Sequence, residues 1–439
     1  MKNQIISLSI GACALCVQAA TTYYWKTPAD GSWNTAENWC TDSGRTTPSE
    51  VVPGISEADI VSFPVGAYTV SASGNDLKVD AMEVKTATTA GNGVVLDIGG
   101  QTLRTMRTSA FICLNGSGPV TKRDFAKPYT SFEFRNGVYD LTTSYLQMIV
   151  TPAQQVIDDR RGCFVIGQGA DVRTTFFEKF YNGSRVFVRD GGKLTCSTGS
   201  TLGHSLANYP VASYYPFICV TGRTSQATIN GQVALGTPGA GLYALDGATV
   251  KTETLKIGYD VNSTNCFVRV DNATLSVNGI IELGGEKDSN VGSAIEIVGE
   301  RARLDVRGGN GQGLKAYNGT GAHIDFEIPA DGFKDADGNV TVPLTACKYT
   351  PTPRGDGQEN LGETELRIKA KKWARRHPLE SITLILLDNT HYSGTSALAA
   401  NAKVLDLKSD DGTPLVTAVD GNKIVLTAPR CPGLMLILK

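Results

Sequence analysis

The chain has 439 residues, of which 41% are hydrophobic and only 19% are charged. This composition excludes a disordered chain, which lacks apolar residues for a core, and a protein with many membrane spans. The 41 Lys and Arg residues nearly balance the 43 Asp and Glu residues, so the formal net charge is −2. Because nucleic acids and anionic lipid surfaces attract basic proteins, we expect neither as a partner.

The first twenty residues have the pattern of a secretory signal peptide. Lys2 gives a positive start, residues 5–17 are mostly apolar, and small residues at 17–19 fit a cleavage site. We therefore expect a signal peptide over residues 1–20 and a secreted or cell-surface mature chain, in the periplasm or outside the cell, without an integral membrane span. An alternative is a lipoprotein, because residues 10–13 loosely match the motif that ends in a lipidated cysteine.

Cysteine usage points to packing more than to chemistry. Eight of the ten cysteines follow the signal segment, and no Cys-x-x-Cys pair occurs among them. Cys219 and Cys266 stand within apolar, strand-like runs. We expect mostly small buried side chains with room for one or two disulfides, and no zinc site.

Residues 21–93 precede the repeats and hold three closely spaced tryptophans, Trp25, Trp33 and Trp39. A solenoid needs its exposed end closed against edge-on association, so this segment predicts an aromatic N-terminal cap followed by the first coils. The alternative is a glycan-stacking platform, because flat indole rings suit pyranose faces. It makes Trp25, Trp33 and Trp39 the candidate ligand-binding residues.

Residues 94–328 carry an internal repeat. A tetrapeptide recurs as Gln-Ala-Thr-Ile at 226–229, Gly-Ala-Thr-Val at 247–250 and Asn-Ala-Thr-Leu at 272–275. A second landmark, an aliphatic residue before glycine, keeps phase with the repeat at Leu202, Leu235, Ile257 and Leu283. Apolar and polar residues alternate around each copy, which indicates strands separated by glycine or Asx turns.

A repeat of about twenty to thirty residues without helices predicts an all-β fold. We expect a right-handed parallel β-helix, a solenoid in which each coil buries its inward side chains against its neighbours. Weaker alternatives are a propeller, whose blades need about 40–50 residues, and a sandwich, which lacks a phase-locked motif. Residues 115–130, 149–161 and 208–216 are expected to form side loops.

Residues 23–63 contain, in order, Trp, Gly-x-Trp, Asn-Trp, Pro and Asp-x-x-x-Phe. This arrangement resembles the segment that opens many bacterial secreted or surface parallel β-helix proteins of the autotransporter-passenger, pectin-lyase-like type. The resemblance implies an exported, adhesin-like or structural protein. The chain departs from a complete autotransporter because its last hundred residues lack a series of ten-residue alternating strands.

The pattern changes after residue 328. Residues 329–357 are rich in Asp, Gly and Pro and predict a linker with a hairpin turn, because the spacing of the carboxylates does not fit a calcium loop. Residues 358–439 predict a β-rich C-terminal cap with a short helix over 363–377, stopped by Pro378. The strands expected in this cap are 381–388, 404–407, 415–419, 423–427 and 433–438.

Catalysis has to be judged from residues, because parallel β-helices also host pectin-degrading enzymes. Asp158, Asp159, His204 and Arg367 partially match the inverting polygalacturonases in chain order, but their spacing does not fit a compact set of coils. No histidine spacing fits a metal site. We therefore expect no catalytic site, no metal and no cofactor.

These patterns together predict an exported structural or adhesive surface protein whose partner is a surface polysaccharide or another cell-envelope protein. The alternative is an extracellular polysaccharide-binding or polysaccharide-degrading protein. A binding protein needs exposed rings at Trp25, Trp33 and Trp39. A degrading enzyme needs carboxylates that converge in one groove, with Asp158, Asp159 and His204 as the residues to check.

Overall fold

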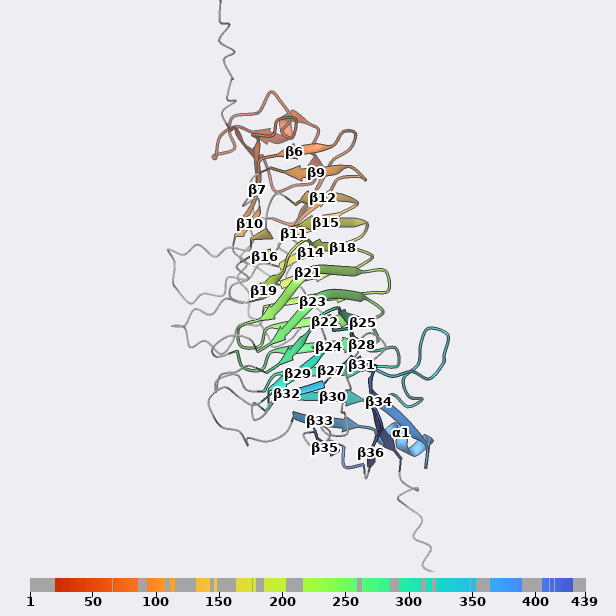
Figure 1. The fold of residues 1–439 in the computed structure, drawn as a ribbon. Coiled ribbons are helices and arrows are strands. Elements are labelled where there is room, and N and C mark those ends of the chain that lie inside the picture. Colours follow the sequence, from red (N-terminus) through yellow and green to blue (C-terminus); the bar gives the residue numbers. More distant parts are fainter. Residues whose placement is uncertain are drawn as a thin grey trace, which may run out of the picture.

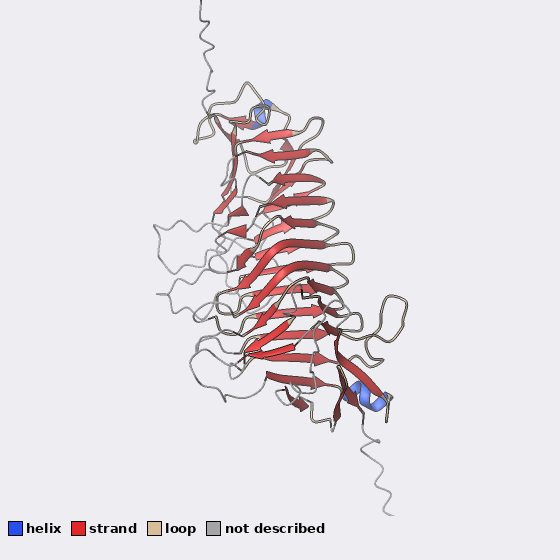
Figure 2. Cartoon of the chain, in the orientation of Figure 1, coloured by secondary structure: helices blue, strands red, loops and turns tan. Residues whose placement is uncertain are grey.

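Strands from successive turns of the chain stack into long sheets in the computed structural model (Figure 1). The described elements are nearly all strands, with one short α-helix near the C-terminal end (Figure 2). The structure describes residues 20–64, 66–85, 93–106, 111–114, 132–142, 146–147, 163–175, 177–178, 185–202, 216–258, 263–284, 292–308, 313–317, 321–347, 349–352, 364–388, 405–409, 411–413 and 415–428.

One sheet has thirteen strands and contains the strands that begin the coils. Its order is β2 (Gly31–Ser32), β5 (Tyr68–Ser71), β8 (Val94–Asp97), β11 (Phe132–Arg135), β14 (Cys163–Ile166), β17 (Arg185–Val188), β20 (Phe217–Thr221), β22 (Gly241–Leu245), β24 (Phe267–Asp271), β27 (Ala294–Val298), β30 (His323–Glu327), β33 (Thr364–Lys369) and β35 (Leu405–Ser409).

A seven-stranded sheet covers another side of the first coils. Its order is β16 (Phe177–Glu178), β13 (Leu146–Gln147), β10 (Phe111–Leu114), β7 (Ala81–Lys85), β4 (Ile60–Phe63), β1 (Thr22–Trp25) and β3 (Trp39–Cys40). The 3-10 turn η1 (Ala36–Asn38) precedes β3.

A third sheet continues to the C-terminal end. Its strands are β6 (Leu77–Val79), β9 (Thr102–Thr105), β12 (Gly137–Leu141), β15 (Ala170–Thr174), β18 (Lys193–Cys196), β19 (Ser200–Leu202), β21 (Gln226–Leu235), β23 (Thr249–Ile257), β25 (Thr274–Val277), β26 (Ile281–Leu283), β28 (Arg303–Val306), β29 (Leu314–Tyr317), β31 (Leu344–Ala346), β32 (Tyr349–Thr352), β34 (Ser381–Leu387), β36 (Val416–Asp420) and β37 (Lys423–Thr427).

One coil visits the sheets in a fixed order. The chain leaves β24 in the thirteen-stranded sheet, passes through β25 and β26, and returns to β27, which pairs in parallel with β24. The same step is repeated along the ladder of strands that runs the length of the molecule (Figure 1). The predicted all-β, parallel, solenoid-like architecture is therefore confirmed.

The core lies inside the coils, where identical positions of successive strands stack. Leu202 pairs with Leu235, Leu235 with Ile257, and Ile257 with Leu283, and all four side chains are fully buried. These four residues are the second landmark of the sequence, the aliphatic residue before glycine. Their pairing confirms that this landmark recurs at the same position of each coil. Stacked aliphatic side chains exclude water between coils, which isolated coils cannot do.

The first landmark is confirmed for most copies, but the copy at 226–229 is offset by two residues. Val250 pairs with Leu275, as the motif predicts, whereas the partner of Val250 in the preceding coil is Ala227 and not Ile229. Both Ala227 and Ile229 point inward, at 1% and 0% exposure. A shift of two residues keeps every side chain on the same face of a strand, so alternation cannot detect it.

Sharp corners separate the thirteen-stranded sheet from the third sheet. Asn136, Asp190, Asp246 and Asn272 occupy these corners with φ between 44° and 54°. Asn and Asp tolerate this left-handed conformation better than other residues with a Cβ atom. The predicted Asx turns are thus the bends that let each coil change sheet.

The C-terminal region departs from the predicted boundaries. Strands β31 and β32 lie within the expected linker and continue the third sheet through it, while a bridge between Lys334 and Val340 forms the expected hairpin. The α-helix α1 spans only Lys371–Arg376, and residues 364–369 form β33. Residues 364–369 form a strand instead of the predicted helix because the alternating residues Leu366 and Ile368 are buried in the core.

The other predicted C-terminal elements are close to the observed ones. Strands β34, β35, β36 and β37 match the expected strands to within two residues. β37 pairs antiparallel with both β34 and β36, so the parallel ladder gives way to an antiparallel sheet. The predicted strand at 433–438 and the side loops at 115–130 and 149–161 lie outside the described residues, as does 208–216 except for its last residue.

Candidate functional site

The outer face of the thirteen-stranded sheet carries side chains that the core does not need. On each strand, alternate residues point inward, and the residues between them point outward. Register places one outward residue of each strand beside the next along the sheet. From β8 to β33, these residues are, in order, Val95, Glu133, Val165, Phe187, Cys219, Tyr243, Arg269, Glu296, Asp325 and Arg367.

The middle of this outer face is apolar and buried. It forms a second hydrophobic cluster, separate from the core inside the coils, with no member more than 3% exposed. The cluster consists of Cys163, Val165, Phe187, Phe217, Cys219, Tyr243, Phe267 and Ala294. The ring of Phe217 meets those of Phe187 and Tyr243 edge to face, at centroid distances of 5.3 and 5.5 Å.

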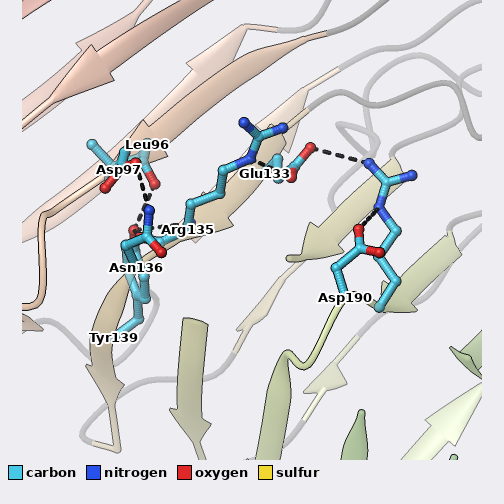
Figure 3. Close-up of polar contacts among 8 residues, drawn as sticks. Leu96, Asp97, Glu133, Arg135, Asn136, Tyr139 and Asp190 are labelled. Carbon is cyan, nitrogen blue, oxygen red and sulfur yellow. Dashed lines mark hydrogen bonds and ion pairs between the residues drawn. The ribbon is translucent and has the colours of Figure 1, made fainter. Parts of the chain in front are cut away.

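A charged group adjoins this apolar cluster on its N-terminal side. The Glu133 carboxylate, whose side chain is 5% exposed, accepts hydrogen bonds from Arg135 Nε at 2.6 Å and Arg189 Nη2 at 3.2 Å (Figure 3). Asp190 lies 3.5 Å from Arg189 Nε. The hydrogen bond from Arg135 to Glu133 raises the pKa of Arg135. Two guanidinium groups thus hold one buried carboxylate in place.

The adjacent corner is fixed by a buried tyrosine. The Tyr139 hydroxyl lies 2.6 Å from the Leu96 carbonyl oxygen and 2.7 Å from the Arg135 carbonyl oxygen, so its one hydrogen serves two acceptors (Figure 3). Burial raises the pKa of Tyr139 well above its ordinary value. Asn136 Nδ2 donates to Asp97 Oδ2 at 2.7 Å. These contacts join neighbouring coils.

A second charged group follows the apolar cluster on its C-terminal side. Arg269 donates to Asp271 at 2.7 Å and to Glu296 of the next coil at 3.0 Å. Burial works to lower the pKa of Arg269, but the hydrogen bond and charge of Asp271, joined by those of Glu296, outweigh it and raise that pKa. Farther along, Arg367 binds Glu365 at 2.8 Å.

These contacts limit what the carboxylates can do chemically. A general acid or base has to face substrate with a tuned protonation state. The carboxylates of Glu133, Glu296 and Glu365 instead form ion pairs with arginine side chains of the same sheet. The arrangement suits cohesion between strands.

The three tryptophans predicted as a glycan platform lie inside the first coils. Trp25 is 1% exposed, and Trp33 and Trp39 are 0% exposed. Trp33 Nε1 donates to the Pro53 carbonyl oxygen and Trp39 Nε1 donates to the Trp33 carbonyl oxygen, both at 2.8 Å. Stacking on a sugar needs an open ring face, and these rings face one another, with Trp39 centroids 4.9 to 5.0 Å from the other two. Burial therefore removes the basis for the platform.

The predicted carboxylate and histidine candidates lie beyond the part of the chain that the structure describes. Asp158, Asp159 and His204 lie outside the described residues. Arg367 lies on β33 and is paired with Glu365, while Ile368 points into the core at 1% exposure. Sequence reasoning missed Glu133 and its two arginines. The signal available was a charged residue between two phenylalanines at 132–134, which marks an outward position on a buried strand.

The described residues contain buried thiols but no cluster of metal ligands. Six cysteines there are buried, and burial raises the pKa of both Cys219 and Cys266 to about 12. Among those residues, no group of three or more His, Cys, Asp or Glu side chains could hold a metal ion. No helix in the same part of the chain has the length and apolar character to cross a membrane.

Comparison with known proteins adds no assignment. No protein-family model matches the chain, and no curated protein or solved structure matches it either. The resemblance of residues 23–63 to secreted β-helix proteins stays a prediction.

Proposed function

We propose that the chain is exported through its N-terminal segment, residues 1–20, and serves as a structural or adhesive element of the cell surface. One observation carries this proposal: ion pairs between different coils join the strands across the outer faces. Glu133 binds Arg189 and Arg269 binds Glu296 on the thirteen-stranded sheet. Charged groups used in this way favour a durable scaffold over a reactive groove.

The other sheets support the same proposal. On the third sheet, Arg104 of β9 binds Asp140 of β12 at 2.9 Å. Glu282 lies 3.5 Å from Lys256 and 3.8 Å from Lys315, so three successive strands share one ladder of alternating charge. Exposed pairs contribute little singly, about 0–1 kcal/mol, but several such pairs join different coils on the two sheets.

We also propose roles for the two ends of the solenoid. The Trp25, Trp33 and Trp39 cluster closes the N-terminal end as an aromatic cap, and the antiparallel strands β34, β37 and β36 close the C-terminal end. We propose the right-handed sense for the coils, because connections between parallel strands of one sheet are right-handed in about 98% of cases. The partner is a surface polysaccharide or another cell-envelope protein.

Export is tested with the native leader. The full chain is expressed in a bacterial host, and the mature N-terminus and cell fraction are determined. We expect a chain that begins at residue 20 or 21, outside the cytoplasm, while a variant lacking residues 2–20 stays inside. Equal cytoplasmic retention of both chains contradicts the proposal.

Adhesion is tested on an array of acidic and neutral polysaccharides with the exported chain. Specific retention without new reducing or unsaturated ends supports adhesion. New ends refute the structural proposal and favour the degrading enzyme, with Asp158→Asn and His204→Ala as the first variants to test. If nothing is retained, the partner is sought among envelope proteins.

A further inference from the structure

Exposed large apolar side chains occur at the two ends of the molecule, Val51 and Ile55 at one and Leu379 and Val416 at the other, and at Val340 on the hairpin between β30 and β31. Within the part of the chain that the structure describes, these large side chains and their exposed fractions are Ile55 83%, Val340 77%, Val416 61%, Leu379 57% and Val51 53%. None of them lies on a strand in the middle of the ladder. Apolar side chains that gather on an exposed surface mark candidate contact sites.

At the N-terminal end, Ile55 projects from a firmly held loop. The loop rests on β6, the first strand of the third sheet, because the Lys78 amide donates to the Gly54 carbonyl oxygen at 2.9 Å. Buried Asp59 accepts a hydrogen bond from the Gly54 amide at 2.9 Å. Ile55 is thus presented by a fixed backbone.

A hollow of about 770 Å³ opens beside Ile55. Its lining combines small apolar surface with two carboxylates and one amine, contributed by Ala20, Ile55, Ser56, Glu57, Ala58, Lys78 and Asp80. Glu57 lies 3.3 Å from Lys78, and its side chain is still 58% exposed. Ile55, Val51 and this hollow are called the N-terminal contact surface.

At the opposite end, Leu379 follows α1 in a strained conformation. Its φ is +66°, a left-handed value that a leucine rarely adopts. The Leu379 amide donates to the Ala428 carbonyl oxygen at 3.2 Å, which holds the turn in place. Val416 lies on β36, the outermost strand of the antiparallel sheet at the same end (Figure 1). Strain of this kind persists where the surroundings fix it, often at a contact site.

Basic side chains are present at the same end of the molecule. Lys371, Lys372 and Arg375 are exposed on α1, four to eight residues before Leu379. Leu379, Val416 and these three cations are called the C-terminal contact surface. Its charge is opposite to that of Glu57 and Asp80 at the other end, and both surfaces have an apolar centre.

We propose that the C-terminal contact surface of one copy binds the N-terminal contact surface of a second copy, so that the chains join head to tail. The two surfaces differ, so the contact is heterologous and leaves a free end on every copy. Such a contact builds a linear filament unless its rotation closes a ring. This inference goes beyond the proposed function and depends neither on export nor on adhesion.

The test uses two variants that each block one end. Ile55→Asp blocks the N-terminal contact surface, and Leu379→Asp blocks the C-terminal one. Aspartate tolerates the left-handed conformation at 379, so the second variant is expected to fold. Each chain is purified after export and studied by sedimentation velocity over a range of concentrations, with thermal melting as the check on folding.

The parent chain should form species that grow with concentration, and each variant alone should associate at least about tenfold more weakly. An equal mixture of the two variants should form dimers and nothing larger, because each partner keeps one working end. A parent chain that stays monomeric at about 100 µM overturns the proposal. So does strong dimerisation of Ile55→Asp alone, which means that like ends pair.

Charge reversal tests the same contact independently. Glu57→Lys and Arg375→Glu should each weaken association, and a chain with both changes should associate more strongly than either, since the opposite charges face each other again. Lys251→Glu, on an exposed lateral position of β23, is the matched control and should change nothing. Equal weakening by the control contradicts a contact confined to the ends.

Discussion

Replacing Trp33 by alanine should loosen the first coils and leave the later coils intact. The Trp33 side chain is fully buried, lies 4.9 Å from Trp39 and 5.9 Å from Phe63 between ring centroids, and donates one hydrogen bond to Pro53. Removing a buried tryptophan costs about 3–5 kcal/mol. Trp33→Phe keeps most of the packing but leaves the Pro53 carbonyl without its donor, which costs about 1–3 kcal/mol.

Hydrogen exchange read by mass spectrometry locates the loss. Each coil of a solenoid contacts only its neighbours, so destabilisation at one end opens that end first. Protection in β4 and β5 should fall by about a hundredfold or more for Trp33→Ala and by about tenfold for Trp33→Phe. Protection in β24 and β27 should not change. The reasoning is refuted if β4 keeps its protection in the alanine variant, or if β24 loses as much as β4 does.

Three further predictions concern other parts of the chain. Glu133→Gln should lower the free energy of unfolding by about 1–3 kcal/mol, measured by urea titration, whereas Asp171→Asn in the exposed pair with Arg173 should cost less than about 1 kcal/mol. The Thr47 backbone amide lowers the pKa of Asp42 from 3.8 to about 2, so its stabilisation is present above pH 4 and is lost as the pH falls toward 2. Asp42→Asn should remove that acid dependence from the exchange of residues 41–49. Cys219 and Cys266 should resist alkylation at pH 8 until the chain is unfolded, because burial raises the pKa of each thiol to about 12; rapid labelling of the folded chain would contradict this.

The architecture could be predicted from the sequence because the same packing pattern recurs in every coil of a solenoid. Leu235, Ile257 and Leu283 occupy one stacked column, and each copy obeys the same rule of an apolar residue before a glycine. Turn positions such as Asp246 and Asn272 were visible for the same reason, since few residue types adopt a left-handed φ. Whatever recurs in every coil leaves a periodic signal.

Contacts that occur once leave no such signal. Glu133 and Arg189 are 56 residues apart in sequence and two strands apart in the sheet, so their pairing depends on a register that alternation does not fix. The offset copy at 226–229 shows how a shift of two residues escapes detection. Burial is the other unknown: the spacing of the three tryptophans favours a closed cluster because a solenoid end needs closing, but it does not exclude an open platform.

The ends of a solenoid are where unique contacts have to arise. An interior coil is packed on both sides by neighbours of its own kind, so its sequence is constrained toward the common pattern. The first and last coils lack one neighbour and carry different features, packed indole rings around Trp33 in the first coils and an antiparallel sheet ending in β36 near the C-terminus. We propose that these devices act as caps. Because these devices differ, the two ends present different surfaces, and a directional contact between copies becomes possible without any change to the repeated coils.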